Sequence, residues 1–212
     1  MKRMLLSLLF MLCTALPVLR AGEPVSEAER LQLTARIQET AAATRTLQCR
    51  FTQVRTMSVL TEEFRSEGRL YYVRPQQLRW QYTAPYQYDF LMNGDEVTLR
   101  SEQSRQTINA AENKMFRQIC TVMAGGIDGS LLQDSRNYRI GWTRSEGAVE
   151  AVLQPLDKPF KDLFKAIVIR LETATWSVTD IVMEETGGDS THITFKDSKT
   201  NEPIDEQIFR IQ

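Results

Sequence analysis

The residue types that carry most catalysis and metal binding are scarce in this sequence. It has one histidine, His192, and after the N-terminal region only two cysteines, Cys49 and Cys120. His192 alternates with Ile193 and Phe195 along a predicted strand, which places it on the solvent side. Metal sites built from nitrogen and sulfur need clusters of such ligands, and the sequence contains none. We therefore expect no catalytic residue, no metal and no cofactor.

Motifs of the common enzyme classes are also missing. The sequence has no G-x-S-x-G turn, no phosphate-binding loop and no dinucleotide fingerprint. We expect that the protein is not an enzyme, because a lipid-ester hydrolase would need a serine beside His192 and no motif indicates one. For Cys49 and Cys120 two states stay open. An exported chain can form a disulfide, whereas two buried free thiols, the state we favour, suit their apolar surroundings.

The first residues have the layout of a secretory signal peptide. A short basic segment is followed by an apolar run at residues 4–12, which is too short to span a bilayer. We predict a signal peptide at residues 1–21 and an exported chain of residues 22–212 that forms one domain. Cys13 raises the alternative of a lipid anchor, for which the large side chain of the preceding Leu12 is unfavourable.

The overall charge excludes one class of partner. The formal net charge is −1, from 26 basic and 27 acidic residues. Proteins that bind nucleic acid carry a basic excess, so nucleic acid is not expected as a partner. After the signal region, no segment has the continuous apolar length of a membrane helix. The composition indicates an exported globular domain.

One helix is predicted at the start of the exported chain. Ser26-Glu27-Ala28-Glu29 matches a capping box, in which the serine and glutamate side chains each satisfy a backbone N–H of the first turn. Leu33, Ile37 and Ala41 follow at a spacing of one turn and form an apolar stripe. The region also alternates as a strand would, but the cap and the composition favour a helix over residues 27–44.

From residue 47 onward the apolar residues recur with a period of two. The turns between these runs include Arg74-Pro75, Ala84-Pro85 and the hairpin signal Asn93-Gly94. Short strands joined by close turns favour an antiparallel meander. We predict about 11 strands, at residues 47–52, 64–73, 78–82, 86–92, 97–101, 138–142, 148–154, 166–171, 176–185, 191–196 and 207–211.

Two helical segments interrupt the strands. Asn109 is a suitable N-cap for a helix that runs to about Ala124. Gly125-Gly126 is expected to end that helix. Residues 157–164 are predicted to form a short amphipathic turn.

Large apolar residues dominate one face of the predicted sheet. They are Phe51, Phe64, Leu70, Tyr72, Leu78, Trp80, Tyr82, Tyr88, Phe90 and Met92. One interpretation is a well-filled core, which aromatic stripes usually form. The other is a concave apolar hollow under a removable cover of helices. The pattern alone does not choose between them.

Several motifs, in this order, resemble the outer-membrane lipoprotein carrier family, LolA. They are Phe51-Thr52-Gln53, Gly68-Arg69-Leu70-Tyr71-Tyr72, Arg74-Pro75, Leu78-Arg79-Trp80-Gln81-Tyr82, Pro85, Asn93-Gly94-Asp95, and the terminal Asn201-Glu202-Pro203-Ile204-Asp205 with Phe209. The resemblance extends over residues 26–211. It departs from the family at residues 102–115, which lack the expected aromatic residues, so the lid contacts and the ligand size stay open there.

The resemblance implies a mainly β (α+β) fold, an incomplete antiparallel β-barrel whose concave apolar face is covered by a lid of helices. It implies a soluble carrier of the periplasm, expected to be a monomer, that holds the acyl chains of lipoproteins. An inner-membrane lipoprotein-releasing ABC transporter would load it, and an outer-membrane receptor would unload it. The alternative is a related lipid- or glycolipid-binding module in envelope trafficking or stress sensing.

The resemblance also assigns roles to residues. The large residues named above would line the lipid-binding cavity. Arg74 would latch the lid by donating to backbone carbonyls, a role that suits a guanidinium; the alternative is a solvated arginine before a turn proline. The lid would be formed by apolar residues of the predicted helices, namely Leu33, Ile37, Phe116, Ile119, Met123, Phe160 and Phe164.

Overall fold

The computed structural model describes residues 22–60, 62–158 and 160–210. The predicted signal peptide, residues 1–21, lies outside this part. Within the described ranges, no helix combines the length and the apolar composition needed to cross a bilayer.

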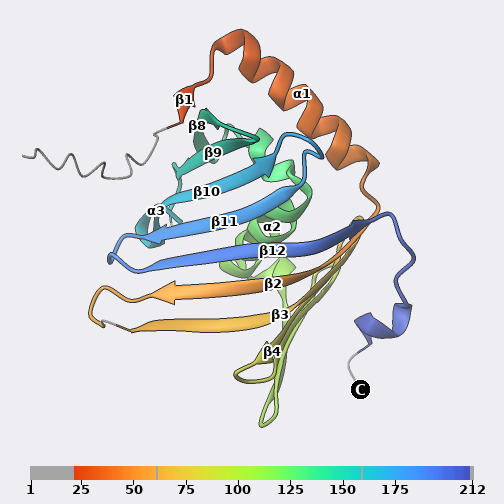
Figure 1. The fold of residues 1–212 in the computed structure, drawn as a ribbon. Helices are drawn as coiled ribbons and strands as arrows, with labels where there is room; N and C mark the ends of the chain where they lie inside the picture. The colour runs from red at the N-terminus through yellow and green to blue at the C-terminus, as the bar shows by residue number, and fades with distance from the viewer. Residues whose placement is uncertain (1–21, 61, 159, 211–212) are drawn as a thin grey trace, which may run out of the picture.

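One antiparallel sheet forms the body of the protein (Figure 1). Its strand order is β1-β8-β9-β10-β11-β12-β2-β3-β4-β5-β6-β7. The edge strands β1 and β7 are not neighbours, so the barrel is incomplete, as predicted. The strands are β1 (Glu23–Pro24), β2 (Thr46–Thr56), β3 (Glu63–Val73), β4 (Gln77–Ala84), β5 (Tyr88–Asn93), β6 (Glu96–Ser101), β7 (Arg105–Asn109), β8 (Tyr138–Ser145), β9 (Ala148–Pro155), β10 (Phe164–Glu172), β11 (Val178–Glu185) and β12 (Ser190–Thr200).

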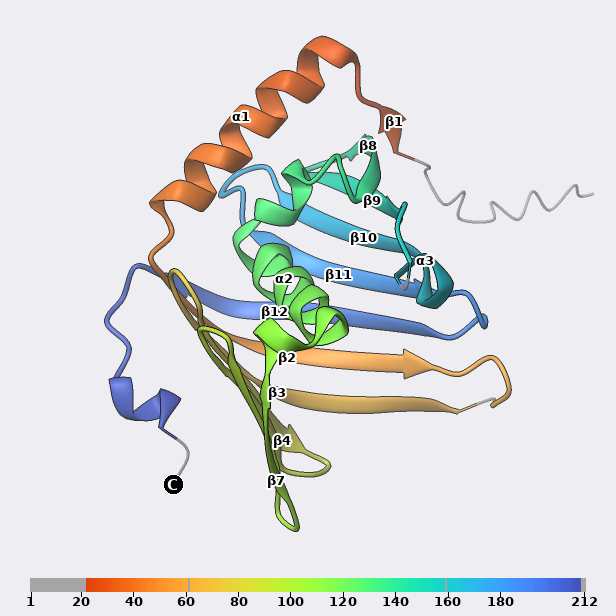
Figure 2. The same ribbon diagram turned by 180° about the vertical axis from the view of Figure 1, so that it is seen from behind.

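Helices cover the inner face of this sheet. They are α1 (Glu27–Ala43), α2 (Lys114–Asp128), α3 (Phe160–Leu163) and the short 3-10 helices η1 (Ala110–Glu112) and η2 (Ser130–Gln133). A third 3-10 helix, η3 (Glu206–Phe209), does not lie on this face. The two views show α2 lying along the inner face, while α1 runs from the β1 edge to the start of β2 (Figures 1 and 2). The predicted capping box of α1 is confirmed, because Ser26 and Glu29 exchange the expected hydrogen bonds.

The helix predicted at residues 109–124 is wrong at both ends. Asn109 caps η1, and a second asparagine, Asn113, caps α2. The helix continues through Gly125 and ends at Asp128, and the following Gly129, with a φ of 77°, is its left-handed C-cap. Gly125 serves packing instead, because a Cβ atom there would lie 3.0 Å from a backbone nitrogen of η2.

Three strands have no counterpart when the predicted and observed sets are compared. The strand predicted at residues 207–211 is wrong, because residues 207–209 belong to η3, which Asp205 caps by accepting from the Gln207 N–H. The prediction lacks β1, which has only two residues, and the mostly polar β7. These changes account for the twelve strands of the described residues, where about 11 were expected.

The strand register gathers the predicted apolar residues on one face, called here the inner face. Trp80 lies directly opposite Leu70 on β3 and Phe90 on β5. Residues directly opposite each other point to the same side of a sheet. These residues form one hydrophobic core with Cys120 and Ile127 of α2. The inner face is therefore covered by α2 in this structure.

Gly68 makes room for the aromatic packing. It lies opposite Phe51 on β2 and Tyr82 on β4. A Cβ atom at Gly68 would fall 2.5 Å from Phe51 Cζ and 2.0 Å from the Gln81 carbonyl oxygen, closer than atoms can approach. The Phe51 ring can thus lie 4.7 Å from the Trp80 ring, between centroids.

The outer face of β4, β5 and β6 carries a buried charge cluster. Asp89, which is 4% exposed, accepts from Arg79 Nε at 2.8 Å and from Arg100 Nη2 at 2.9 Å. Arg79 also donates through Nη1 to the carbonyl oxygen of Ile208, at 2.9 Å. The cluster therefore joins the C-terminal η3 to the outer face of the sheet.

Candidate functional site

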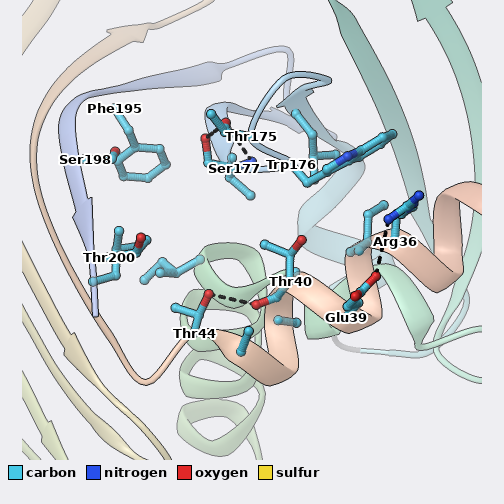
Figure 3. Close-up of a pocket in the computed structure, with 18 of the residues that line it drawn as sticks. Arg36, Glu39, Thr40, Thr44, Thr175, Trp176, Ser177, Phe195, Ser198 and Thr200 are labelled. Atoms are coloured by element: carbon cyan, nitrogen blue, oxygen red, sulfur yellow. Dashed lines mark hydrogen bonds and ion pairs between the residues drawn. The ribbon is translucent and has the colours of Figure 1, made fainter. Parts of the chain in front are cut away.

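A cavity of about 490 Å³ lies between α1 and the sheet (Figure 3). Its volume is in the range typical of small-molecule sites. Residues of α1 form one wall, and the turn between β10 and β11 and the end of β12 form the opposite one.

Two kinds of side chain line this cavity. The apolar ones include Ile37, Leu47, Ile127, Leu171, Trp176, Val178 and Phe195. The hydroxyl and amide ones are Thr40, Thr44, Thr175, Ser177, Ser198, Thr200 and Asn201. The charged lining residues, Arg36 and Glu39, pair with each other at 3.5 Å. The lining suits an apolar chain joined to an uncharged polar head group.

Trp176 reaches the cavity from an unusual backbone conformation. Its φ is 56°, in the left-handed region where a bulky residue is an outlier. Such a conformation costs on the order of 1–3 kcal/mol unless its surroundings hold it. Here the Trp176 N–H donates to the Glu172 carbonyl, and the Thr175 hydroxyl donates to the Glu172 carboxylate. The prediction of a strand from residue 176 is therefore wrong, since β11 begins at Val178.

Cys49 lies on β2 and lines the cavity beneath α1. Burial raises the pKa of its thiol to about 12, against the effect of a hydrogen bond with Ser198. The second cysteine, Cys120, is also buried, and both thiols are free. The structure therefore agrees with two buried free thiols and has no bridge between Cys49 and Cys120.

The apolar contact between α1 and the rest of the protein is narrow. Only Leu33, Ile37 and Ala41 of its residues are buried hydrophobics. Ile37 packs at the end of α2, where a Cβ atom on Gly129 would lie 3.0 Å from Ile37 Cγ2. The Gln38 side chain also donates to that of Gln133 in η2, at 3.1 Å. Thus α1 rests largely on the junction between α2 and η2.

Polar contacts hold the C-terminal end of α1. Arg74, in the turn between β3 and β4, donates through Nη1 to the carbonyl oxygens of Ala41, at 2.8 Å, and Ala42, at 3.2 Å. Its backbone N–H donates to the Arg45 carbonyl. Arg74 thus has the geometry that the resemblance implies for a latch, and the latch role itself stays a prediction.

The N-terminal end of α1 is held by separate contacts. The Val25 N–H donates to the Trp142 carbonyl of β8 at 3.2 Å. Glu29 in the first helical turn pairs with Arg144 of the same strand at 3.4 Å. Both ends of the helix are therefore tied to the sheet by polar groups.

The predicted cavity residues lie on the inner face, and all of them except Phe64 are buried or partly buried there. Seven are buried core residues, Phe51, Leu70, Tyr72, Leu78, Trp80, Phe90 and Met92, while Tyr82 and Tyr88 are partly buried against them. Phe64 is the correction: it is 48% exposed, because it lies at the start of β3 beyond the covered part of the face. The lining of the observed cavity includes none of these residues. In this closed structure they form packed core.

The predicted lid residues divide in a similar way. Leu33 and Ile37 are buried, Phe116 and Met123 of α2 are partly buried against the core, and Ile119 of α2 is half-buried. The region at residues 157–164 is only partly helical. Phe160 in α3 is buried and its ring lies 5.6 Å from that of Phe164. Phe164 is the first residue of β10, so its place in a helical lid is wrong.

His192 lies on the outer face of β12, as expected. Its Nε2 is 2.9 Å from Asp180 Oδ1, and its side chain is half exposed. Burial disfavours the charged form of Asp180, but hydrogen bonds from His192 and Thr194 outweigh this and lower its pKa. Among the described residues no cluster of histidine, cysteine and acidic side chains could hold a metal ion.

Sequence reasoning missed Trp176 and Asn201 as cavity residues. Trp176 follows no glycine or proline, so nothing in the sequence signals its conformation. Asn201 stands before Glu202-Pro203, and asparagine tolerates the left-handed conformation that it adopts, with φ of 59°. That turn signal identifies the bend but not the contact with α1.

Comparisons with known proteins agree with this architecture. The family model described as outer membrane lipoprotein carrier protein LolA matches residues 42–212. An outer-membrane lipoprotein carrier protein of Pseudomonas aeruginosa is 28% identical over 165 residues, which are 77% of this chain and 76% of the relative.

Two solved structures share the fold at lower identity. An uncharacterized conserved protein from Thermus thermophilus has a TM-score of 0.52 and 10% identity, covering 86% of this chain and 93% of that one. MucB has a TM-score of 0.50 and 16% identity, covering 88% of this chain and 64% of that one. The family match covers strands β2 to β12 and the helices between and after them, but not β1 or most of α1, and it shows the family. The chain belongs to the outer membrane lipoprotein carrier protein LolA family.

Proposed function

We propose that this chain is a periplasmic carrier that binds the acyl chains of lipoproteins beneath α1 and shuttles them from the inner to the outer membrane. The observation that carries the proposal is how α1 closes the cavity. The helix covers a partly apolar space, yet a narrow apolar contact and polar groups at its two ends hold it. The family match over residues 42–212 supports the same function.

A carrier must release what it binds, and this requirement fits a loosely held cover. Each buried methylene contributes about 0.8 kcal/mol, so three acyl chains removed from water would gain on the order of tens of kcal/mol. A cover whose own contacts are lost when ligand enters lowers that gain. Burial of Leu33 and Ile37 stabilises the closed state by roughly 1.5–3 kcal/mol each. The apolar part of the cost of opening α1 is then about 3–6 kcal/mol, well below the gain from three acyl chains.

The predicted cavity residues would bind ligand only after the cover moves. Trp80, Phe90 and Met92 are buried in the same core as Cys120 and Ile127 of α2. Moving α1 and α2 away would join the inner face to the existing cavity and make room for longer chains. Flexible methionines such as Met92 suit this task, because they repack around irregular apolar groups.

The partners follow from this role. An inner-membrane lipoprotein-releasing transporter would load the carrier, and an outer-membrane receptor would accept the lipoprotein. No covalent chemistry is needed for either step, so the proposed function is not enzymatic.

The experiment uses residues 22–212 and a fluorescent triacylated lipopeptide. After mixing and removal of micelles by size exclusion, lipopeptide is expected to elute with the protein. Leu33→Ala should raise its affinity, because the closed state that competes with ligand loses a buried side chain. Leu31→Ala is the matched control, since Leu31 is on the same helix and 60% exposed. Failure of the unmodified protein to retain any lipopeptide would remove the carrier proposal.

One observation favours a second candidate. The hydroxyl and amide side chains of the cavity would also suit the sugar head group of a glycolipid. In that case the protein would be a glycolipid-binding module in envelope trafficking or stress sensing. Competition in the same assay separates the two candidates. A glycolipid that displaces the fluorescent lipopeptide at a lower concentration than unlabelled lipopeptide does would favour the second candidate.

A further inference from the structure

Asn201 joins the end of β12 to both sides of the junction between α1 and β2. Its Nδ2 donates to the carbonyl oxygen of Ala43, the last residue of α1, at 3.1 Å. Its Oδ1 accepts from the backbone N–H of Arg45 at 2.8 Å. Its own backbone N–H donates to the carbonyl of Thr46, the first residue of β2, at 2.9 Å. One side chain and one amide thus hold three consecutive parts of the junction.

These contacts complete the set that Arg74 begins. The last carbonyls of a helix lack partners within the helix and need donors from elsewhere. Here Arg74, in the turn between β3 and β4, donates to the carbonyls of Ala41 and Ala42. Asn201, at the end of β12, donates to the carbonyl of Ala43. The two donors come from strands on either side of β2 in the sheet. The C-terminal end of α1 therefore accepts hydrogen bonds from side chains on both sides of β2.

The backbone of Asn201 is adapted to this contact. Its φ of 59° is in the left-handed region, which asparagine adopts more readily than other residues with a side chain. The conformation ends β12 and turns the amide toward α1. Asn201 also lines the cavity, so a change in its contact with α1 occurs at the site itself.

We propose that Asn201 is a positioning residue of the lid, the second half of a two-sided clasp with Arg74 that keeps α1 closed over the cavity. The clasp is defined by the Arg74 and Asn201 side chains and the carbonyls of Ala41, Ala42 and Ala43. Release of either half frees part of the helix end and raises the population of open α1. The inference rests on the proposed function for its meaning, but its test uses no lipid.

The test measures how often the cavity beneath α1 opens. Cys49 lines that cavity, so its alkylation by N-ethylmaleimide at pH 8, in a Cys120→Ser background, reports opening of α1. Cys120 lies on α2 and is buried in the core, so its alkylation in a Cys49→Ser background reports opening that extends beyond α1. Asn201→Gly keeps the left-handed backbone accessible and removes the side chain. Asn201→Asp keeps the acceptor for Arg45 but replaces the donor to Ala43 with a carboxylate.

Both Asn201 variants are expected to raise the Cys49 alkylation rate by about 5-fold or more while leaving the Cys120 rate unchanged. Glu202→Ala is the matched control, because the neighbouring Glu202 side chain contacts Gln48 and Lys199 rather than α1. It should leave both rates unchanged. The proposal is overturned if Asn201→Gly alkylates Cys49 at the unmodified rate, or if it raises the Cys49 and Cys120 rates equally. Loss of lipopeptide binding with an intact clasp would instead count against the carrier function alone.

Discussion

The Nη1 atom of Arg74 lies 2.8 Å from the carbonyl oxygen of Ala41. This contact joins the turn after β3 to the last turn of α1, between residues 33 positions apart in the sequence. The last turn of α1 has no basic residue of its own. The guanidinium therefore supplies the positive charge that a helix C-terminus favours. A side chain from outside the helix therefore contacts its C-terminal end.

Arg74→Leu is expected to loosen α1 and slow the release of cargo. A hydrogen bond from a charged donor contributes about 1.5–3 kcal/mol, and the exposure of Arg74 reduces this to about 1 kcal/mol, or roughly 5-fold in the population of open α1. Because the closed state competes with ligand, the variant should hold lipopeptide more tightly. Transfer of fluorescent lipopeptide to acceptor vesicles measures this, with Arg69→Leu, an exposed arginine of β3, as the control. Transfer at the unmodified rate would show that Arg74 is not a latch.

Gly68→Ala tests the packing of the inner face. The added Cβ would collide with Phe51 and with the Gln81 carbonyl, and backbone cannot move aside as a flexible side chain can. Overpacking of this kind costs about 1–3 kcal/mol or more, which urea denaturation measures as a lower midpoint. Gly141→Ala in β8 is the matched control, since the nearest atom to its Cβ lies 4.0 Å away. Equal midpoints for both variants would contradict the role assigned to Gly68.

The elements with strong local signals were predictable. Ser26 and Glu29 fix the start of α1 by contacts within one turn, and the alternation around Trp80 reflects the burial of one face of the sheet. Asn109 and Asn113 show where local signals fail, since both can cap a helix and only the packing of η1 separates them. Gly125 looks like a stop but lies within α2.

The cavity itself could not be predicted from pattern. Alternation places Phe64 with Trp80 on one face, yet it does not reveal how far along β3 the helical cover extends. Trp176 and Asn201 reach the cavity through left-handed backbone conformations that depend on tertiary contacts. The sequence indicated an apolar face, and only the arrangement of α1 against the sheet separates its filled part from its open part.

The free energy of unfolding is expected to fall between pH 10 and pH 12. Burial raises the pKa of Tyr82 from 10.0 to about 12, and burial has the same effect on Tyr138. When the pKa of a phenol is higher in the folded chain than in the unfolded one, its contribution to stability is complete below pH 10. That contribution is lost as the pH rises through 12. Urea denaturation at several pH values should show a smaller fall in the free energy of unfolding for Tyr82→Phe than for Tyr71→Phe. Tyr71 is the comparison because it lies on the outer face of the sheet. An identical fall in the two variants would contradict the assignment.

Asp89→Asn is expected to destabilise the fold far more than Asp197→Asn. Asp89 is buried between Arg79 and Arg100, and breaking a buried pair costs roughly 3 kcal/mol. Asp197 pairs with Arg50 where both side chains are more than half exposed, so its loss costs less than about 1 kcal/mol. Denaturation curves measure both values. Comparable losses would mean that the charge cluster does not support the outer face.

Native mass spectrometry of the protein, purified from cell envelopes without detergent, tests the central claim most directly. If α1 opens to admit acyl chains, part of the protein should carry an added mass that fragments into fatty acyl groups. Displacement by the synthetic lipopeptide should then remove that mass. A spectrum with only the unliganded protein, together with no uptake of lipopeptide by the same sample, would contradict a carrier that binds acyl chains beneath α1.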